Sequence, residues 1–361
     1  FRSIDVLRAC HQLGVPVVAR GAGTGLSGGA MPHAQGVVLS LARFNRILRV
    51  DPLARLAVVQ PGVRNLAVSE AAAPHGLYYA PDPSSQIACT LGGNVAENSG
   101  GVHCLKYGLT VHNVLRIRVV SIEGEVFEIG SEAPDAPGYD LLALLIGSEG
   151  MLGVVTEVTV KLVPKPELAQ VVMASFNDVA KAGEAVAAII AAGIIPAGLE
   201  MMDKPATAAV EPFVKAGYDL NAEAILLCES DGTPEEVAEE IARVTEVLTR
   251  AGASHISVSQ SEAERLRFWA GRKAAFPAAG RISPDYYCMA DEIATTGTYH
   301  THVFFYAPSP SRFSTVKKRF PIAHIEKAYG SVQENRSYLR KDGRWADTDK
   351  AETSVPGTFE E

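Results

Sequence analysis

The sequence of 361 residues lacks the features that mark several classes of protein. No apolar run approaches the about 18 residues that a membrane-spanning helix needs. Basic residues number 33 against 41 acidic ones, which gives a formal net charge of −8. Such a chain gains little from contact with phosphate backbones, so we expect no nucleic-acid partner. The five cysteines form no CxxC pair, which argues against a disulfide framework and a zinc site.

The chain begins at Phe1, and no secretory signal is visible after it. We therefore expect a fragment that has lost its original start, together with any targeting signal carried there. The expected location is cytoplasmic, with association to a membrane made only through partners.

The first 165 residues consist of short apolar runs separated by glycine and proline turns. Helical patterns are confined here to 3–13, 65–75 and 140–146. Runs of strand length lie at 15–19, 36–41, 56–60, 114–121, 126–129 and 154–162. This half is predicted to be an α+β domain with much loop.

After the domain boundary expected near residue 165, the sequence predicts longer helices that alternate with strands. Thr233-Pro234-Glu235-Glu236 is a capping box with proline at the first helical position. Strands are expected at 171–176, 197–202, 224–229 and 254–258, and helices at 177–192, 205–216 and 234–250. With the helix at 205–216 as an insertion, this order is the split β-α-β unit used twice, as in ferredoxin-like folds.

A glycine-rich loop follows the first predicted strand, with five glycines between Gly21 and Gly29. Gly23-x-Gly25-x-x-Gly28 fits the dinucleotide pattern, but that pattern needs a helix at its third glycine. Pro32 and a second strand follow instead, and the Lys-Ser/Thr of a P-loop is missing. The remaining interpretations are a plain turn, or a curve of backbone N–H groups that binds phosphate oxygens.

Two further loop-like stretches raise the odds of a functional site. Residues 81–101 contain Thr90-Leu91-Gly92-Gly93-Asn94, and residues 147–157 contain Gly147-Ser148-Glu149-Gly150. Loops longer than about 12–15 residues without structure of their own are usually functional.

Together, in order and spacing, the three segments resemble the FAD-linked oxidases of the vanillyl-alcohol-oxidase, or PCMH-type, family. The similarity is to glycolate oxidase flavoprotein subunits and D-lactate dehydrogenases, and it runs from Phe1 to about Asp291. The resemblance implies a PCMH-type FAD-binding domain of two α+β subdomains over 1–165, without its N-terminal edge. A ferredoxin-like cap domain, incomplete, would cover 166–291. Residues 292–361 would be an unmatched and partly disordered tail.

The resemblance also implies the residues that hold FAD. The first glycine loop would hold the pyrophosphate, residues 90–101 would wrap the pyrophosphate and the flavin, and residues 147–155 would close the site. The implied set is Gly21, Ala22, Gly23, Thr24, Gly25, Leu26, Ser27, Gly28, Asp82, Thr90, Gly92, Gly93, Asn94, Asn98, Gly100, Gly101, Glu149, Gly153 and Val155. Leu26-Ser27 stands where some members carry a tethering histidine, so we expect non-covalent FAD.

On the substrate side, Phe268-Trp269-Ala270-Gly271-Arg272 resembles a tryptophan–arginine motif of the family's cap domain. It implies that Arg272 clamps the substrate carboxylate, a task suited to the guanidinium fork, although a surface ion pair is the alternative. Arg281 is a weaker second candidate. His103 matches a family position near the flavin and is a candidate catalytic residue; the alternative is a loop histidine with a hydrogen-bonded partner.

The resemblance ends where family members carry two histidines and a Glu-His pair that bind a metal and deprotonate the substrate. Nothing in 292–361 matches these residues, so we expect no metal and identify no base. His300 and His302 would share one face of a strand, a weak half-site, and His324 stands alone.

The implied function is oxidation of a small D-2-hydroxy acid, such as glycolate or D-lactate, with hydride transfer to flavin N5. Electrons would pass to a quinone, a cytochrome or a partner protein rather than to NAD, and partner subunits are possible. Two alternatives stay open: a flavin-binding remnant or non-catalytic subunit without turnover, and a flavin reductase that uses NADPH.

Overall fold

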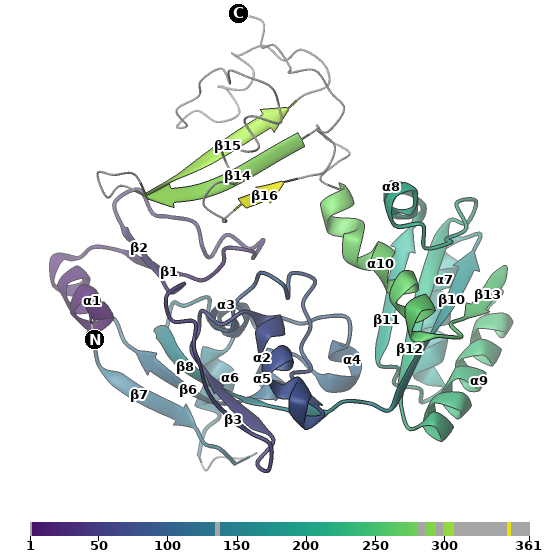
Figure 1. Ribbon diagram of the computed structural model, residues 1–361, viewed down its shortest axis with the longest axis horizontal. Helices are drawn as coiled ribbons and strands as arrows, with labels where there is room; N and C mark the ends of the chain where they lie inside the picture. The colour runs from purple at the N-terminus through teal and green to yellow at the C-terminus, as the bar shows by residue number, and fades with distance from the viewer. Residues whose placement is uncertain (1, 134–137, 280–285, 294–298, 307–344, 348–361) are drawn as a thin grey trace, which may run out of the picture. The chain divides into compact units, whose positions relative to one another are not determined.

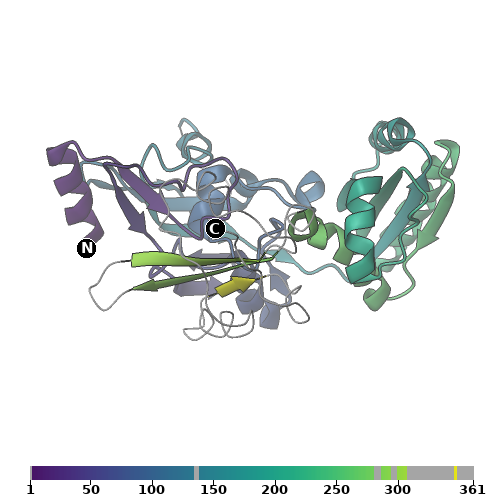
Figure 2. The ribbon, with the colours of Figure 1, turned by 90° about the horizontal axis from the view of Figure 1, so that it is seen from above.

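The computed structural model describes residues 2–133, 138–279, 286–293, 299–306 and 345–347. Contacts divide the chain into two compact units. Figures 1 and 2 show the helices and strands of the chain in two views. The first comprises residues 1–204 and 216–272, and the second comprises 205–215 and 273–361. The domain boundaries expected from the sequence stay predictions.

A five-stranded antiparallel sheet forms the centre of the N-terminal half of the first unit. Its order is β3 (Ile47–Asp51), β4 (Leu56–Val59), β8 (Val154–Lys161), β6 (Val114–Val120) and β7 (Val126–Gly130). The central β8 has four valines and two threonines, and β-branched side chains of this kind fit a pleated surface. Val59, Ile117 and Val158 are fully buried in the core beside it. The strands predicted in this half are confirmed within one or two residues.

Smaller elements flank this sheet. Helix α1 (Arg2–Leu13) precedes the parallel pair β1 (Val17–Arg20) and β2 (Val37–Ser40), and no helix opens between these two strands. The rejection of a Rossmann-type loop is therefore confirmed. Helix α2 (Asn65–Ala72) tightens into the 3-10 turn η1 (Ala73–His75), and β5 (Leu77–Tyr78) pairs with β9 (Val163–Pro164).

The expectation of only three helices in this half is wrong. Besides the predicted α6 (Leu141–Leu145), short helices form at α3 (Leu91–Glu97), α4 (Cys104–Tyr107) and α5 (Thr110–Asn113). Two glycines make α3 a poor helix by local propensity. Tertiary packing stabilises it instead, since Leu91 and Val95 are fully buried in the core.

The C-terminal half of the first unit has the predicted ferredoxin-like order. Its antiparallel sheet runs β11 (Gly198–Asp203), β12 (Ala224–Gly232), β10 (Leu168–Phe176), β13 (His255–Val258). Helices α7 (Val179–Ala191) and α9 (Pro234–Arg250) pack on one face of it (Figure 1). The capping box is confirmed: the Thr233 hydroxyl accepts from the Glu236 N–H, and the Glu236 carboxylate accepts from the Thr233 N–H.

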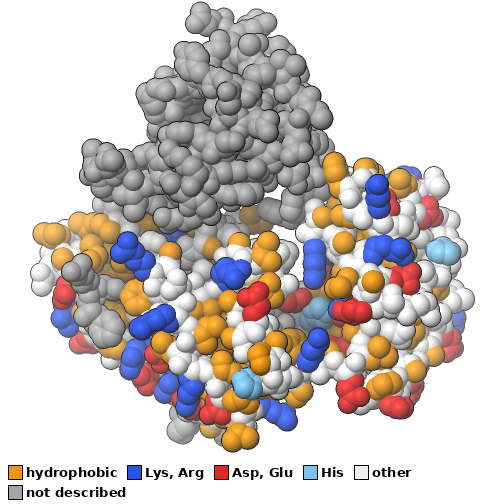
Figure 3. Space-filling model, viewed as in Figure 1, with side chains coloured by type: hydrophobic (Ala, Val, Ile, Leu, Met, Phe, Trp, Pro, Cys, Tyr) orange, Lys and Arg blue, Asp and Glu red, His pale blue; other side chains and the backbone are white. Residues whose placement is uncertain are grey.

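The two faces of β12 differ in chemistry, because alternate side chains point to opposite sides. Leu226 and Cys228 join the core under α7 and α9. Glu229 and Asp231 belong to the other face. Helix α10 (Glu262–Ala279) contacts this face, since its Arg265 and Trp269 bond Glu229. Acidic and basic side chains are interspersed over the surface shown in Figure 3.

The second unit contains most of α8 (Lys204–Val214) and an antiparallel sheet. The sheet order is β15 (Tyr299–Tyr306), β14 (Tyr286–Ile293), β16 (Trp345–Asp347). The backbone of β15 places His300 and His302 at alternate positions. Arg281 and His324 lie outside the described residues. None of the helices described has the length and apolar character to cross a membrane.

Candidate functional site

The three glycine-containing segments singled out in the sequence meet at one place. A hollow of about 50 Å³ is lined by Gly21 after β1, by Gly92 and Gly93 of α3, and by Glu149 and Gly153 before β8. Strand β1 precedes the first segment, α3 contains the second, and the third leads into β8, so these elements fix where the three segments lie. Residues more than 120 positions apart in the sequence thus meet at one hollow, as their pattern predicts. We call this hollow and the glycine segments around it the cradle.

Several positions around the cradle require glycine, because other atoms lie where a Cβ atom would be. A Cβ atom at Gly21 would collide with the Thr90 hydroxyl, and one at Gly101 would collide with the Asp82 backbone. At Gly92 it would lie 2.6 Å from the Pro61 Cβ. The backbone is therefore exposed to whatever occupies the hollow, without side chains in between.

Two buried polar atoms beside the hollow have no hydrogen-bond partner among the described residues: Thr90 Oγ1 and Asn94 Nδ2. Thr90 is 7% exposed and Asn94 is 2% exposed. Buried polar groups are nearly always hydrogen-bonded, so an unpaired hydroxyl beside Gly21 indicates a ligand with polar atoms.

Two carboxylates approach the same loop. Glu97 lies against Gly25, and Glu149 lies against Gly29. Burial raises the pKa of Glu149, and the charge of Glu97 raises it further. Carboxylates repel phosphate but accept hydrogen bonds from hydroxyl groups, so this end of the loop suits a sugar-like group rather than a phosphate.

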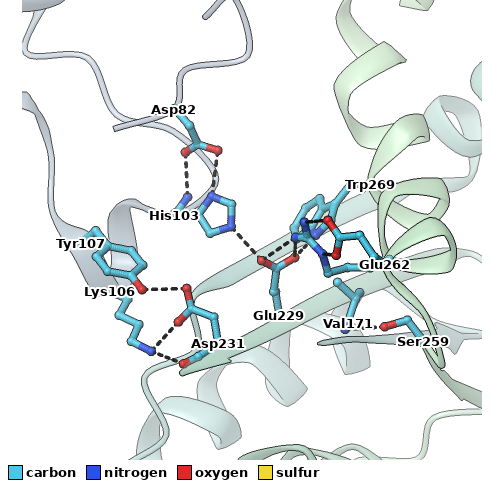
Figure 4. Close-up of polar contacts among 11 residues, drawn as sticks. Asp82, His103, Lys106, Tyr107, Val171, Glu229, Asp231, Ser259, Glu262 and Trp269 are labelled. Carbon is cyan, nitrogen blue, oxygen red and sulfur yellow. Dashed lines mark hydrogen bonds and ion pairs between the residues drawn. The ribbon is translucent and has the colours of Figure 1, made fainter. Parts of the chain in front are cut away.

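A second cluster centres on His103 (Figure 4). Its backbone N–H donates to Asp82 Oδ1 at 3.1 Å, its Nδ1 lies 2.8 Å from Asp82 Oδ2, and its Nε2 lies 3.0 Å from Glu229 Oε1. Burial lowers the pKa of His103, but hydrogen bonds and charge from the two carboxylates outweigh it and raise the pKa to about 10. The ring is therefore an imidazolium at neutral pH.

Glu229 is the buried centre of this cluster, with its side chain 2% exposed. Besides His103 it accepts from Arg265 Nη1, at 3.0 and 2.9 Å, and from Trp269 Nε1. Burial favours a raised pKa for Glu229, but the bonded His103 and the charge of Arg265 hold the pKa below its ordinary value. The sequence did not indicate Glu229 or Arg265; the only available signal was two acidic residues at alternate positions of a strand.

Beside this cluster, Asp231 holds two residues of α4. Lys106 Nζ donates to its carbonyl oxygen at 2.7 Å and to Oδ1 at 2.5 Å, and the Tyr107 hydroxyl donates to Oδ2 at 2.7 Å. A cavity of about 540 Å³ borders both clusters. It is lined by Tyr78, His103, Lys165, Pro166, Glu167, Leu168, Ala169, Gln170, Glu229, Asp231, Ser259, Gln260, Ser261, Glu262 and Arg265.

Arg272 does not line this cavity. Its Nε donates to Glu200 Oε2 at 2.8 Å, and its side chain is 30% exposed. Arg265, Trp269 and Arg272 are spaced i, i+4, i+7 and so lie on one face of α10. That face meets Glu229 and Glu200, which are carried by neighbouring strands of one sheet.

Comparison with known proteins agrees with this geometry. Residues 3–130 match the family model of an FAD binding domain, and residues 165–296 match that of the C-terminal domain of FAD linked oxidases. The chain belongs to the FAD-linked oxidase family. The resemblance expected from the three segments is confirmed.

Named members of this family are similar over much of the chain. It is 66% identical over 284 residues to glycolate oxidase subunit GlcD of Escherichia coli K12, a match covering 79% of this chain and 57% of that protein. It is 41% identical over 280 residues to GlcD of Bacillus subtilis, covering 77% and 60%. It is 36% identical over 281 residues to a D-lactate dehydrogenase of Anaerostipes hadrus, covering 76% and 59%. The FAD-linked oxidase chain thus spans less than two thirds of these relatives.

Solved structures show the same fold at low identity. An alkyldihydroxyacetonephosphate synthase superposes with a TM-score of 0.64 at 20% identity, covering 81% of this chain and 57% of that one. A p-cresol methylhydroxylase superposes with a TM-score of 0.64 at 17% identity, covering 80% and 64%. The α+β, PCMH-type fold class expected from the sequence is confirmed.

A third family model, described as a putative viral replication protein, matches residues 278–342. It overlaps the FAD-linked oxidase match over 278–296 and covers most of the segment that was expected to be an unmatched tail. The expectation that the chain has no nucleic-acid partner stays a prediction.

FAD is the cofactor of this family, and the cradle fits it. A glycine-lined hollow admits a backbone-bound pyrophosphate, and the unpaired atoms of Thr90 and Asn94 offer hydrogen bonds to a polar ligand. Glu97 and Glu149 suit the hydroxyl groups of a ribose. The roles of the individual residues stay predictions.

Proposed function

We propose that the chain forms the flavin-binding and part of the substrate-binding machinery of an FAD-dependent oxidoreductase for a small 2-hydroxy acid, such as glycolate or D-lactate. The observation that carries this proposal is the meeting of three glycine-containing segments at one hollow, beside the unpaired Thr90 hydroxyl. The similarity to glycolate oxidase subunits and a D-lactate dehydrogenase supports the choice of substrate class.

On the cofactor side, the loop from Gly21 to Gly28 binds FAD. Backbone N–H groups at its Gly21 end hold the pyrophosphate, its Gly25 end beside Glu97 takes a ribose hydroxyl, and Thr90 and Asn94 add side-chain hydrogen bonds. A flavin bound there would supply the acceptor for the hydride that leaves the hydroxyl-bearing carbon of the substrate. Leu26 and Ser27 stand where some members of the family carry a tethering histidine, so binding is non-covalent.

On the substrate side, Arg272 binds the carboxylate. Glu200 holds its Nε at 2.8 Å, and a guanidinium has further donors for a second carboxylate. Orientation of the substrate by this fork would set which face of its hydroxyl-bearing carbon is presented.

His103 holds Asp82 and Glu229 and does not remove a proton at neutral pH. Both its ring nitrogens are bonded to carboxylates, and its pKa of about 10 keeps it protonated. The base is therefore unassigned among the described residues. The electron acceptor is a quinone, a cytochrome or a partner protein rather than NAD.

The visible absorption spectrum of the purified chain, before and after anaerobic addition of D-lactate or glycolate, tests this proposal. We expect flavin bands that bleach with a D-2-hydroxy acid and persist with L-lactate. Absence of flavin bands, even after FAD is added to the folded chain, would overturn the cofactor assignment.

A second candidate is a flavin-binding chain without turnover. It rests on the protonated state of His103, which leaves no base assigned among the described residues. Flavin bands that persist with every hydroxy acid, yet bleach with dithionite, would identify this outcome.

A further inference from the structure

Arg265 lies between two carboxylates of very different exposure. Its Nη1 bonds Glu229, whose side chain is 2% exposed. Its Nε and Nη2 bond the two oxygens of Glu262 at 2.7 and 2.8 Å, and the Glu262 side chain is 64% exposed. One edge of the guanidinium is thus fixed in the interior, while the other is covered by a carboxylate that reaches solvent.

The covered edge has the geometry with which arginine recognises carboxylates in general. Two parallel N–H donors face two oxygens of one group. The Glu262–Arg265 pair is spaced i, i+3 on α10, and ion pairs with an exposed partner contribute little to stability. A dissolved carboxylate can therefore take the place of Glu262 at small cost, while Glu229 keeps the guanidinium in position.

Space for such an anion is present at the same edge. Arg265 and Glu262 both line the cavity of about 540 Å³, within the range of small-molecule sites. Lys165, Gln260 and Ser261 line it too and offer donors to an anion or a hydroxyl group. The buried acids facing it are already neutralised: Glu229 by His103 and Arg265, and Asp231 by Lys106.

We infer that this cavity is a binding site for a small carboxylate anion of the hydroxy-acid type, with Arg265 as its fork and Glu262 as an internal carboxylate that the ligand displaces. The site is separate from Arg272, which is bonded to Glu200 and does not line the cavity. The choice of a hydroxy acid as the anion rests on the proposed function. The assignment of Arg265 as the fork and of Glu262 as the displaced carboxylate rests on their contacts alone.

Substitution Glu262→Gln tests the inference without disturbing the interior. Ligand-observed NMR of glycolate with the FAD-loaded full chain gives the affinity. We expect glycolate to bind the variant about two- to fivefold more tightly than the unchanged chain, the size of effect of one exposed ion pair. The matched control is Glu264→Gln on the same helix, since Glu264 pairs with Arg267 at i, i+3 and lies outside the cavity lining. Glu264 also accepts from the backbone N–H of Gln260, a bond that the amide oxygen of glutamine can keep. This control should leave the affinity unchanged.

Arg265→Lys supplies the opposite change, because lysine keeps the charge and loses the fork. We expect glycolate binding to weaken about tenfold, with Arg267→Lys unchanged and circular dichroism confirming the fold of both. Equal affinities for Glu262→Gln and the unchanged chain, or an equal gain in Glu264→Gln, would overturn the inference. Bleaching of the flavin by glycolate is scored separately, so failure of the proposed reaction and failure of this site are distinguishable.

Discussion

Nε2 of His103 lies 3.0 Å from Oε1 of Glu229, a residue 126 positions later in the chain. The contact joins the segment just before α4, which carries His103, to the acidic face of β12. It is a charged pair, because His103 is protonated and the pKa of Glu229 is held low. Stability of this part of the chain should therefore depend on pH through His103.

The expected pH dependence follows from the raised pKa of His103. Its folded pKa of about 10 exceeds the ordinary value of 6.5. The stabilisation of the folded chain by protonated His103 is therefore fully present below about pH 6.5, and it is lost as the pH rises through about 10. In urea unfolding, the chain should lose about 3–4 kcal/mol more than a His103→Gln variant between pH 7 and pH 10. His255→Gln, at the exposed end of β13, is the control. Equal losses in the chain and in His103→Gln would contradict the assignment.

Glu229→Gln should be strongly destabilising. The buried carboxylate accepts from His103, Arg265 and Trp269, and a neutral amide removes the buried negative charge that His103 and Arg265 share, leaving each with one carboxylate, Asp82 and Glu262. We expect a loss of about 3 kcal/mol in the free energy of unfolding, measured with urea at pH 7. Glu223→Gln is the control, since its pair with Lys204 is nearly half exposed and should contribute less than about 1 kcal/mol. A loss no larger than that of the control would show that Glu229 is not the centre of the cluster.

Local patterns explain why much of the fold could be predicted. The capping box at Thr233 and the spacing of apolar runs depend on neighbouring residues alone, so they predicted the ferredoxin-like order correctly. The three glycine segments could also be recognised in the sequence, because other atoms pack too closely against their backbone for any residue but glycine. Helix α3 was missed since Gly92 and Gly93 disfavour a helix locally, and only burial of Leu91 and Val95 stabilises it.

The polar cluster could not be predicted for a different reason. His103 was identified as a candidate, but its partner Glu229 comes from a distant strand, and no sequence pattern marks that pairing. The Arg272 motif was identified by resemblance, whereas its contact with Glu200 spans 72 positions. The Glu262–Arg265 pair has the i, i+3 spacing of an ion pair on a helix, but it was not identified from the sequence.

Thr90→Val should weaken FAD binding about three- to tenfold, the effect of one hydrogen bond. The Thr90 hydroxyl is buried without a partner beside Gly21, so its removal should leave the stability of the FAD-free chain unchanged or raised. Thr159→Val is a matched control: this hydroxyl is also buried and unpaired, but Thr159 lies in β8 and, unlike Thr90, is not among the atoms closest to Gly21. Flavin fluorescence titration measures the FAD affinity of both variants. A loss of affinity in both variants would point to a general effect on the fold.

Gly21→Ala should abolish FAD binding with little change in secondary structure. The added Cβ would collide with the Thr90 hydroxyl, so the loop must move away from the hollow that Gly21 lines. Gly183→Ala is the control, because a Cβ at this position of α7 meets nothing within 4 Å and alanine favours the helix by about 0.5–1 kcal/mol. Gly183→Ala should therefore bind FAD as the unchanged chain does and melt at a slightly higher temperature. Normal flavin binding by Gly21→Ala would mean that the pyrophosphate lies elsewhere, because only a ligand held against the Gly21 backbone is sensitive to that one methyl group.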